Sequence, residues 1–129
     1  MNRTRIALAT AAVCLAALAH EAQAQPRTVT RVGLVVRPQA HRGTCPATFN
    51  FFGTIHVRHP ARVEYEWERS DGGRGPRQVV DVHGARQTVR ESWKLGAPGE
   101  RRTEWMRLHV LAPTGVSSPQ ARVRLNCRP

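Results

Sequence analysis

The sequence predicts an all-β domain, in which two packed sheets contain about seven short antiparallel strands, preceded by a cleavable helical signal peptide. Three observations support this fold class. Apolar and polar residues alternate in successive short runs, clusters of Gly, Pro, Ser, Asp and Asn separate these runs, and one cysteine lies near each end of the region. No helical period of 3.6 residues persists beyond the first 24 residues.

The first 24 residues have the organisation of an export signal. Arg3 and Arg5 form a basic start, residues 6–19 are almost wholly apolar, and residues 22–24 (Ala-Gln-Ala) provide a small-x-small cleavage site. The apolar run is too short to cross a bilayer, which takes roughly 18 residues or more. We therefore expect a signal peptide at 1–24, a mature domain at 25–129 with no transmembrane segment, and a secreted or periplasmic location.

Cys45 and Cys127 are the cysteines that remain after this cleavage. An even pair in an oxidising compartment is most simply a disulfide, and we expect these two to be joined. If successive strands reverse direction, the start of the second strand and the end of the last lie at the same end of the domain, which brings the pair together. The alternative is two free thiols in a cytosolic protein, and it requires the export interpretation to be wrong.

The alternating runs define the expected strands. The clearest run is 62–69, where Val63, Tyr65 and Trp67 face one way and three glutamates face the other, as a half-buried strand requires. The first run ends at Pro38 and is expected at a sheet edge, because proline cannot donate to a ladder. The expected strands are 28–36, 48–58, 62–69, 78–82, 86–95, 103–111 and 121–128, with a glycine-rich loop at 70–76.

A set of framework residues accompanies this pattern. They are Cys45-Pro46, Phe49, Phe51, Gly53, Ile55, Val63, Tyr65, Trp67, residues 69–72 (Arg-Ser-Asp-Gly), Trp93, Leu95-Gly96, Trp105, Leu108, Val110, Pro113 and Cys127. The set resembles the immunoglobulin-like domains of exported bacterial proteins over nearly all of residues 25–129. This resemblance implies an immunoglobulin-like sandwich with an extracytoplasmic role, and it implies no particular ligand. One departure from antibody domains is that Cys127 lies on the last strand.

The chain is strongly basic. Without Arg3, Arg5 and Glu21, the formal charge is +10, one less than the +11 of all 129 residues. A charge of this size on a small domain attracts phosphate-rich or carboxylate-rich surfaces at low salt. An arginine-rich composition that serves only solubility would give the same charge, so both explanations stay open on sequence alone.

The candidate binding residues lie on the last two expected strands. Arg107, Arg122, Arg124 and Arg128 are expected to point outward together if these strands pair, with Trp105 as an exposed aromatic contact beside them. Our leading hypothesis is a noncatalytic binding or structural module that meets an anionic surface polymer or protein through this basic face. Nucleic acid is not expected as the physiological partner, and the sequence does not predict the oligomeric state.

The row of Glu64, Glu66 and Glu68 has a spacing of roughly 6 to 7 Å along one strand face, which superficially suits acid–base catalysis. Nothing in the sequence would desolvate one carboxyl and raise its pKa. We expect a solvated face instead, with the glutamates paired to basic residues of neighbouring strands such as Arg107 or Arg122.

No catalytic, metal or cofactor site is predicted. His56 and His59 are three residues apart and would point to opposite faces of a strand, which argues against a metal site. No serine lies in a Gly-x-Ser-x-Gly elbow, and residues 72–75 lack the Lys-Ser/Thr of a phosphate-binding loop. Two alternatives stay open. One is an enzyme or metal-handling protein with a site assembled from loops. The other is a surface assembly subunit that pairs through an edge strand, most simply the first expected strand, 28–36.

Overall fold

The structure is a computed structural model that describes residues 26–129, and these residues form nine strands and no helix. The strands are β1 (Val29–Arg37), β2 (Ala40–Gly43), β3 (Ala47–Val57), β4 (Ala61–Arg69), β5 (Gln78–Val82), β6 (Arg86–Leu95), β7 (Arg101–Ala112), β8 (Val116–Ser117) and β9 (Ala121–Cys127). The all-β prediction is confirmed, and every expected run coincides with a strand. The short strands β2 and β8 are additional. The expected signal peptide lies outside the described residues.

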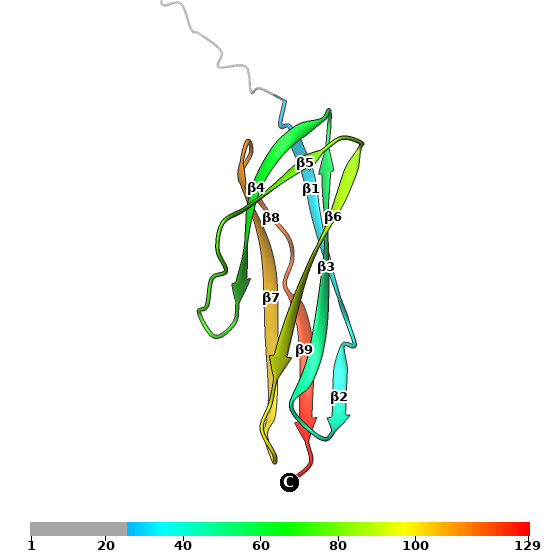
Figure 1. The fold of residues 1–129 in the computed structure, drawn as a ribbon, viewed down its shortest axis with the longest axis vertical. Coiled ribbons are helices and arrows are strands. Elements are labelled where there is room, and N and C mark those ends of the chain that lie inside the picture. Colours follow the sequence, from blue (N-terminus) through cyan, green and yellow to red (C-terminus); the bar gives the residue numbers. More distant parts are fainter. Residues whose placement is uncertain (1–25) are drawn as a thin grey trace, which may run out of the picture.

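The strands form two sheets that face each other along the long axis of the domain (Figure 1). The first sheet has the order β1-β3-β6, and the second has the order β2-β9-β7-β4-β5, with β8 paired to β7. The strand β1 is therefore an edge of the first sheet, as expected from the proline that follows it. Between residues 26 and 129, no helix is long and apolar enough to cross a membrane.

The chain changes sheets between β1 and β2. Strand β1 pairs antiparallel with β3, and its ladder ends before Pro38, which has no amide hydrogen to donate. The carbonyl of Gln39 then accepts a hydrogen bond from the amide of Arg124, and β2 continues alongside β9 in the same direction. The expectation of purely antiparallel pairing is wrong at this place, because the switch after Pro38 sends the chain along the other sheet.

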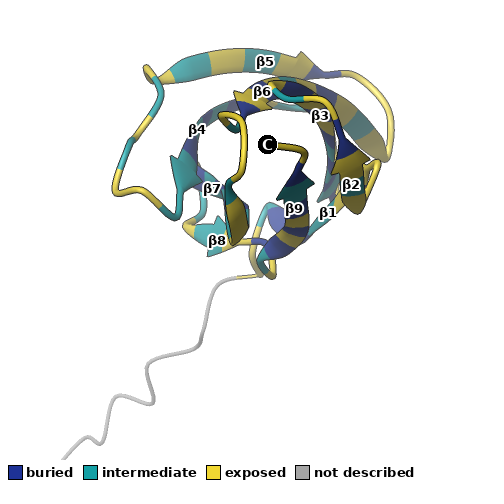
Figure 2. Ribbon diagram, turned by 90° about the horizontal axis from the view of Figure 1, so that it is seen from below, coloured by how far each residue is buried: buried dark blue, intermediate teal, exposed yellow. Residues whose placement is uncertain are grey.

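The core lies between the inward faces of the two sheets. Buried and exposed residues alternate along β3 and β9, which is the period of two that the sequence shows, and the dark segments in Figure 2 mark the buried positions. Phe49, Phe51, Trp67 and Leu108 are fully buried, and they bring the largest apolar surfaces into this interior. Trp67 thus lies on the buried face that the alternation along residues 62–69 predicts, and Trp93 of β6 is buried too.

The predicted disulfide is confirmed at one end of the sandwich. Cys45, in the turn after β2, is bonded to Cys127 at the end of β9, with a Cα–Cα distance of 5.5 Å. Gly96 packs directly against this bridge with φ = +102°, a conformation that side-chain-bearing residues rarely adopt. A Cβ there would lie 2.7 Å from Sγ of Cys127, so this position requires glycine.

Candidate anion-binding face

The last two long strands, β7 and β9, pair antiparallel, which confirms the pairing expected from the sequence. Val123 and Leu125 of β9 are buried, so the alternate residues Arg122 and Arg124 point outward. Arg122 lies directly opposite Trp105 of β7, and Arg124 lies opposite Thr103. Two arginines and an aromatic ring therefore share the outer surface of the second sheet.

Two further arginines extend this surface. Arg42 of β2 lies opposite Asn126 of β9, and Arg101 of β7 lies opposite the same residue from the other side. We call Arg42, Arg101, Arg122, Arg124 and Trp105 the β9 face. Between residues 26 and 129, no carboxylate oxygen lies within 4.0 Å of these four guanidinium groups.

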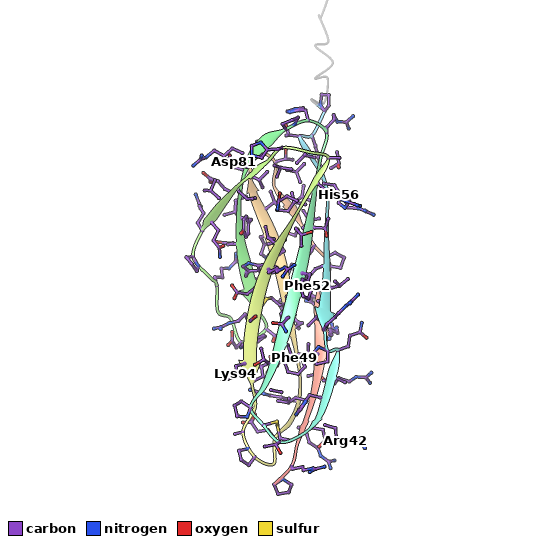
Figure 3. The ribbon with its side chains drawn as sticks, turned by 45° about the vertical axis from the view of Figure 1, so that its right-hand side comes forward. Arg42, Phe49, Phe52, His56, Asp81 and Lys94 are labelled. Carbon is purple, nitrogen blue, oxygen red and sulfur yellow. A yellow bond between two sulfur atoms is a disulfide. The ribbon has the colours of Figure 1, made fainter. Side chains whose placement is uncertain are left out.

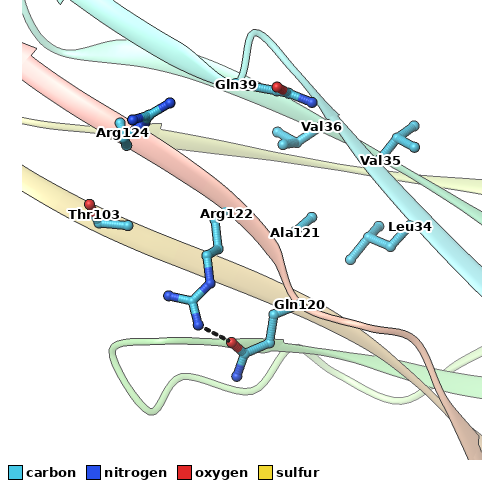
Figure 4. Close-up of a pocket in the computed structure, with 9 residues that line it drawn as sticks. All are labelled: Leu34, Val35, Val36, Gln39, Thr103, Gln120, Ala121, Arg122 and Arg124. Atoms are coloured by element: carbon cyan, nitrogen blue, oxygen red, sulfur yellow. Dashed lines mark hydrogen bonds between the residues drawn. The ribbon is translucent and has the colours of Figure 1, made fainter.

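A groove of about 570 Å³ runs between β1 and the β9 face (Figure 4). Val35 and Val36 of β1 line one wall, and Arg122 and Arg124 line the other. The guanidinium of Arg122 donates a hydrogen bond of 3.0 Å to Oε1 of Gln120. The groove therefore offers apolar surface on one side and cationic donors on the other.

Arg107 packs against Trp105 on the outer surface of β7. Its guanidinium stacks on the ring of Trp105 at 5.5 Å, and its buried Nε has no hydrogen-bond partner among the described residues. It lies opposite Glu68 of β4, on the side of β7 away from Arg122. Both Arg107 and Trp105 are half-buried because each covers the other.

Arg128 does not belong to the outward row of β9. It follows the last residue of that strand, and its amide donates to the carbonyl of Gly43. Its side chain lines a hollow of about 530 Å³ at the end of the domain, together with Arg42 and Arg101. The structure thus brings Arg122, Arg124 and Trp105 together and places Arg128 beside two arginines, Arg42 and Arg101, that were not among the expected binding residues.

The sequence pattern indicates an outward position for Arg101 but gives no such indication for Arg42. Arg101 continues the outward parity of Trp105 and Arg107 along β7, but the expected strand began two residues too late to include it. Arg42 reaches the face through the parallel pairing of β2 with β9, and no local pattern indicates that pairing.

The glutamate row is neutralised by cations other than the expected ones. Arg74 approaches Glu66 at 2.5 Å and Glu68 at 3.8 Å, and Arg77 approaches Glu64 at 3.6 Å. The connection after β4 folds back so that Arg74 pairs with the strand at Glu68, which positions its guanidinium over the row. The expectation of an ion pair to Arg122 is wrong, since β7 separates β9 from β4. Arg107 lies opposite Glu68 and acts on its carboxyl through its charge, but its guanidinium stacks on Trp105 and makes no ion-pair contact with the row.

Glu68 also receives a hydrogen bond from Nε2 of His109, and this bond lowers the pKa of the Glu68 carboxyl below its ordinary value of 4.5. Burial opposes this shift, while the charges of His109, Arg74 and Arg107 add to it. A carboxyl whose pKa falls on folding stabilises the protein above its ordinary pKa and loses that contribution as the pH falls through the folded value.

We therefore expect Glu68→Gln to lower the melting temperature at pH 7 and to leave it closer to wild type at pH 3, as measured by circular dichroism across this range. Glu64→Gln is the matched control, because Glu64 lies on the same strand face with an arginine partner but without a histidine donor. An equal loss of stability at both pH values in Glu68→Gln would contradict the role of the ionised carboxyl.

Among the described histidines, His56 and His59 do not share a site. His56 lies on the outer face of the first sheet beside Arg31, whereas Nδ1 of His59 lies 3.2 Å from the carbonyl of Pro60. From residue 26 onward, no three His, Cys, Asp or Glu side chains are close enough together to hold a metal ion.

Comparison with known proteins identifies no family. No family model matches the chain, and no curated protein matches it. Among solved structures, the CARDB domain of the PF1109 protein from Pyrococcus furiosus, in complex with di-metal ions, aligns with a TM-score of 0.54 and 8% identity, over 81% of this chain and 100% of that one.

The alkylpurine DNA glycosylase AlkC from Pseudomonas fluorescens, bound to DNA containing an abasic site analog, aligns with a TM-score of 0.50 and 16% identity. The match covers 77% of this chain and 30% of the glycosylase chain, so this chain spans less than a third of that enzyme. At these identities the likeness concerns the fold alone. The two-sheet, all-strand architecture and the CARDB neighbour fit an immunoglobulin-like fold.

Proposed function

We propose that residues 25–129 form a noncatalytic, extracytoplasmic module of immunoglobulin-like type that binds an anionic surface polymer through the β9 face. The observation that carries this proposal is the separation of charge across the second sheet. The glutamates of β4 form ion pairs with Arg74 and Arg77, and Glu68 also accepts a hydrogen bond from His109, whereas the arginines of the β9 face have no carboxylate partner among residues 26–129.

The chemistry of the β9 face suits repeated anionic groups. A guanidinium presents a planar fork of donors that binds carboxylate, sulfate or phosphate through two parallel hydrogen bonds. Arg122 and Arg124 are two residues apart on one strand, so their side chains emerge roughly 6 to 7 Å from each other. A polymer with charged groups at a comparable interval would engage both, with its apolar parts against Val35 and Val36.

The disulfide supports an extracytoplasmic location, because such bonds persist in oxidising compartments. The noncatalytic assignment rests on the titratable groups. Within the described chain, the side chains with a displaced pKa are His56, Tyr65 and Glu68. They lie on the outer face of the first sheet, in the core and on the outer face of the second sheet, so they do not share a pocket.

The test is binding of the oxidised domain to a heparin oligosaccharide at several salt concentrations. We expect Arg122→Gln/Arg124→Gln to elute from a heparin column at lower salt than wild type. The slope of log K against log salt should fall by about 1.4 to 1.8, because each lost contact with an anionic group of a polyanion removes about 0.7 to 0.9.

The matched control is Arg62→Gln/Arg77→Gln, which removes the same charge from positions beside Asp81 and Glu64. It should elute close to wild type. Equal elution of the two double variants would mean that net charge alone drives binding. Elution of wild type below about 0.2 M salt would reduce the β9 face to ordinary surface charge.

A further inference from the structure

The outer face of the first sheet carries a row of three basic side chains, one from each strand. Arg31 of β1 lies opposite His56 of β3, and His56 lies opposite Arg86 of β6 on its other side. Like charges that face each other across strands destabilise the pairing. Arg31 and Arg86 flank His56, so the row concentrates like charge once the His56 ring is doubly protonated, and a bound anion would offset that repulsion.

No acidic side chain compensates for the row within its own sheet. The outward positions of β1, β3 and β6 carry Arg, Lys, His, Thr, Ser, Asn, Gly, Val and Phe, but no Asp or Glu. Neither Arg31 nor Arg86 has a carboxylate oxygen within 4.0 Å in the described chain. Figure 3 shows His56, Phe52 and Lys94 distributed along this face.

A β-bulge shapes β1 at this row. The register with β3 shifts between Val29 and Arg31, so Thr30 and Arg31 are both exposed beside His56. The hydroxyl of Thr30 donates to the carbonyl of His56 at 3.3 Å, and Nη2 of Arg31 donates to Nε2 of His56 at 3.0 Å. Because an arginine cannot accept, His56 is the acceptor and carries its proton on Nδ1.

The three basic side chains line a hollow of about 760 Å³. Its other lining residues include Thr54, whose hydroxyl is a further donor, whereas the hydroxyls of Thr30 and of Ser117 in β8 are engaged with the His56 carbonyl and the His109 ring. The hollow thus combines two guanidinium groups, an imidazole and a neutral donor, which is the chemistry that coordinates a tetrahedral oxyanion.

We propose that Arg31, His56 and Arg86 bind a single phosphate or sulfate group in this hollow. The two guanidinium groups approach the oxyanion from either side, and His56 donates to it once its ring is doubly protonated. The site lies on the sheet opposite the β9 face and shares no residue with it, so it goes beyond the function proposed above.

Binding at this site is coupled to proton uptake. Burial and the flanking charges of Arg31 and Arg86 lower the pKa of His56 from its ordinary value of 6.5. The charged groups that face His56 are Arg31 from β1 and Arg86 from β6, with Arg58 just beyond the end of β3 and no carboxylate. A bound dianion favours the imidazolium, so by linkage the affinity rises as the pH falls.

Sulfate tests this coupling more directly than phosphate does, because the charge of sulfate does not change between pH 5 and 8. The experiment follows the backbone amides and the His56 ring of the oxidised domain by NMR during titration with sodium sulfate, against sodium chloride at equal ionic strength. We expect saturable shifts around the three residues. Affinity should be higher at pH 5.5 than at pH 7.5, by up to about thirtyfold, the effect of one added charge about 4 Å from a dianion in a water-like dielectric.

Variants separate the roles of the three residues. Arg31→Gln and Arg86→Gln should each weaken sulfate binding about tenfold, the effect of losing a charge-assisted hydrogen bond. His56→Gln should bind at pH 5.5 as wild type does at pH 7.5, with no pH dependence left. The control Arg37→Gln removes the same charge from the same face of β1, roughly 20 Å along the strand, and should bind as wild type.

The proposal is overturned if sulfate and chloride give the same shifts, if Arg37→Gln weakens binding as much as Arg31→Gln, or if His56→Gln retains the pH dependence. A further arm identifies the source of the oxyanion. Cosedimentation with phosphatidic-acid vesicles that is lost in Arg31→Gln would assign a lipid headgroup, and binding of the free ions alone would assign a soluble ligand.

Discussion

Loss of the disulfide is expected to lower the free energy of unfolding by about 4.5 kcal/mol. Cys45 and Cys127 are 82 residues apart in the sequence, and the bond removes the entropy that the unfolded chain would gain from opening this loop. The total stability of a small domain is about 5 to 15 kcal/mol, so the loss approaches the lower end of that range. Urea unfolding of wild type and of Cys45→Ala/Cys127→Ala, followed by circular dichroism, measures the difference.

Reduced wild type provides the matched comparison for this experiment. It retains both sulfur atoms but lacks the covalent bond, so its stability should fall close to that of the double alanine variant. A loss below about 1 kcal/mol in both samples would mean that the closed loop contributes little to the stability of this domain.

Gly53→Ala is expected to destabilise the domain by about 1 to 3 kcal/mol, the usual cost of overpacking a core. A Cβ at this position of β3 would lie 2.4 Å from Cδ2 of Leu108, 3.2 Å from Cγ2 of Val89 and 3.3 Å from Cη2 of Trp67. Leu108 and Trp67 are fully buried, so neither can move aside without displacing its own neighbours. Urea unfolding again gives the measurement.

Gly33→Ala tests whether this cost arises from the core. Gly33 lies on β1, and its added Cβ would meet nothing within 4 Å. The substitution also reduces the conformational freedom of the unfolded chain, so its effect should range from neutral to a gain of about 1 kcal/mol. Equal destabilisation by both substitutions would show that loss of glycine itself, and not crowding at Leu108, is the cause.

The strands were predictable because their signal is local. In β4, Val63, Tyr65 and Trp67 are two residues apart, and the period of two identifies both the strand and its buried face without knowledge of its neighbours. The disulfide was predictable because two cysteines in a domain that is expected to be exported have few alternatives. For the strands, the determining pattern lies within each segment. For the disulfide, it lies in the number of cysteines.

The features that the sequence did not predict depend on pairings between segments that are far apart in the chain. Strands β2 and β8 are too short to show a period, and the parallel pairing that brings Arg42 beside Arg124 has no local signature. The pairing of Arg74 with the glutamate row required the fold of the loop after β4. The row of Arg31, His56 and Arg86 exists through the register of three strands, although each residue has the alternating parity of an outward position.

The position of the disulfide has a consequence for proteolysis. Residues 70–77 form the longest connection between strands in the described chain, and such exposed, glycine-containing loops are preferred sites of cleavage. Any single cut there falls between Cys45 and Cys127, so the two fragments remain covalently linked. A nicked molecule would keep both sheets together and would separate into two pieces only after reduction.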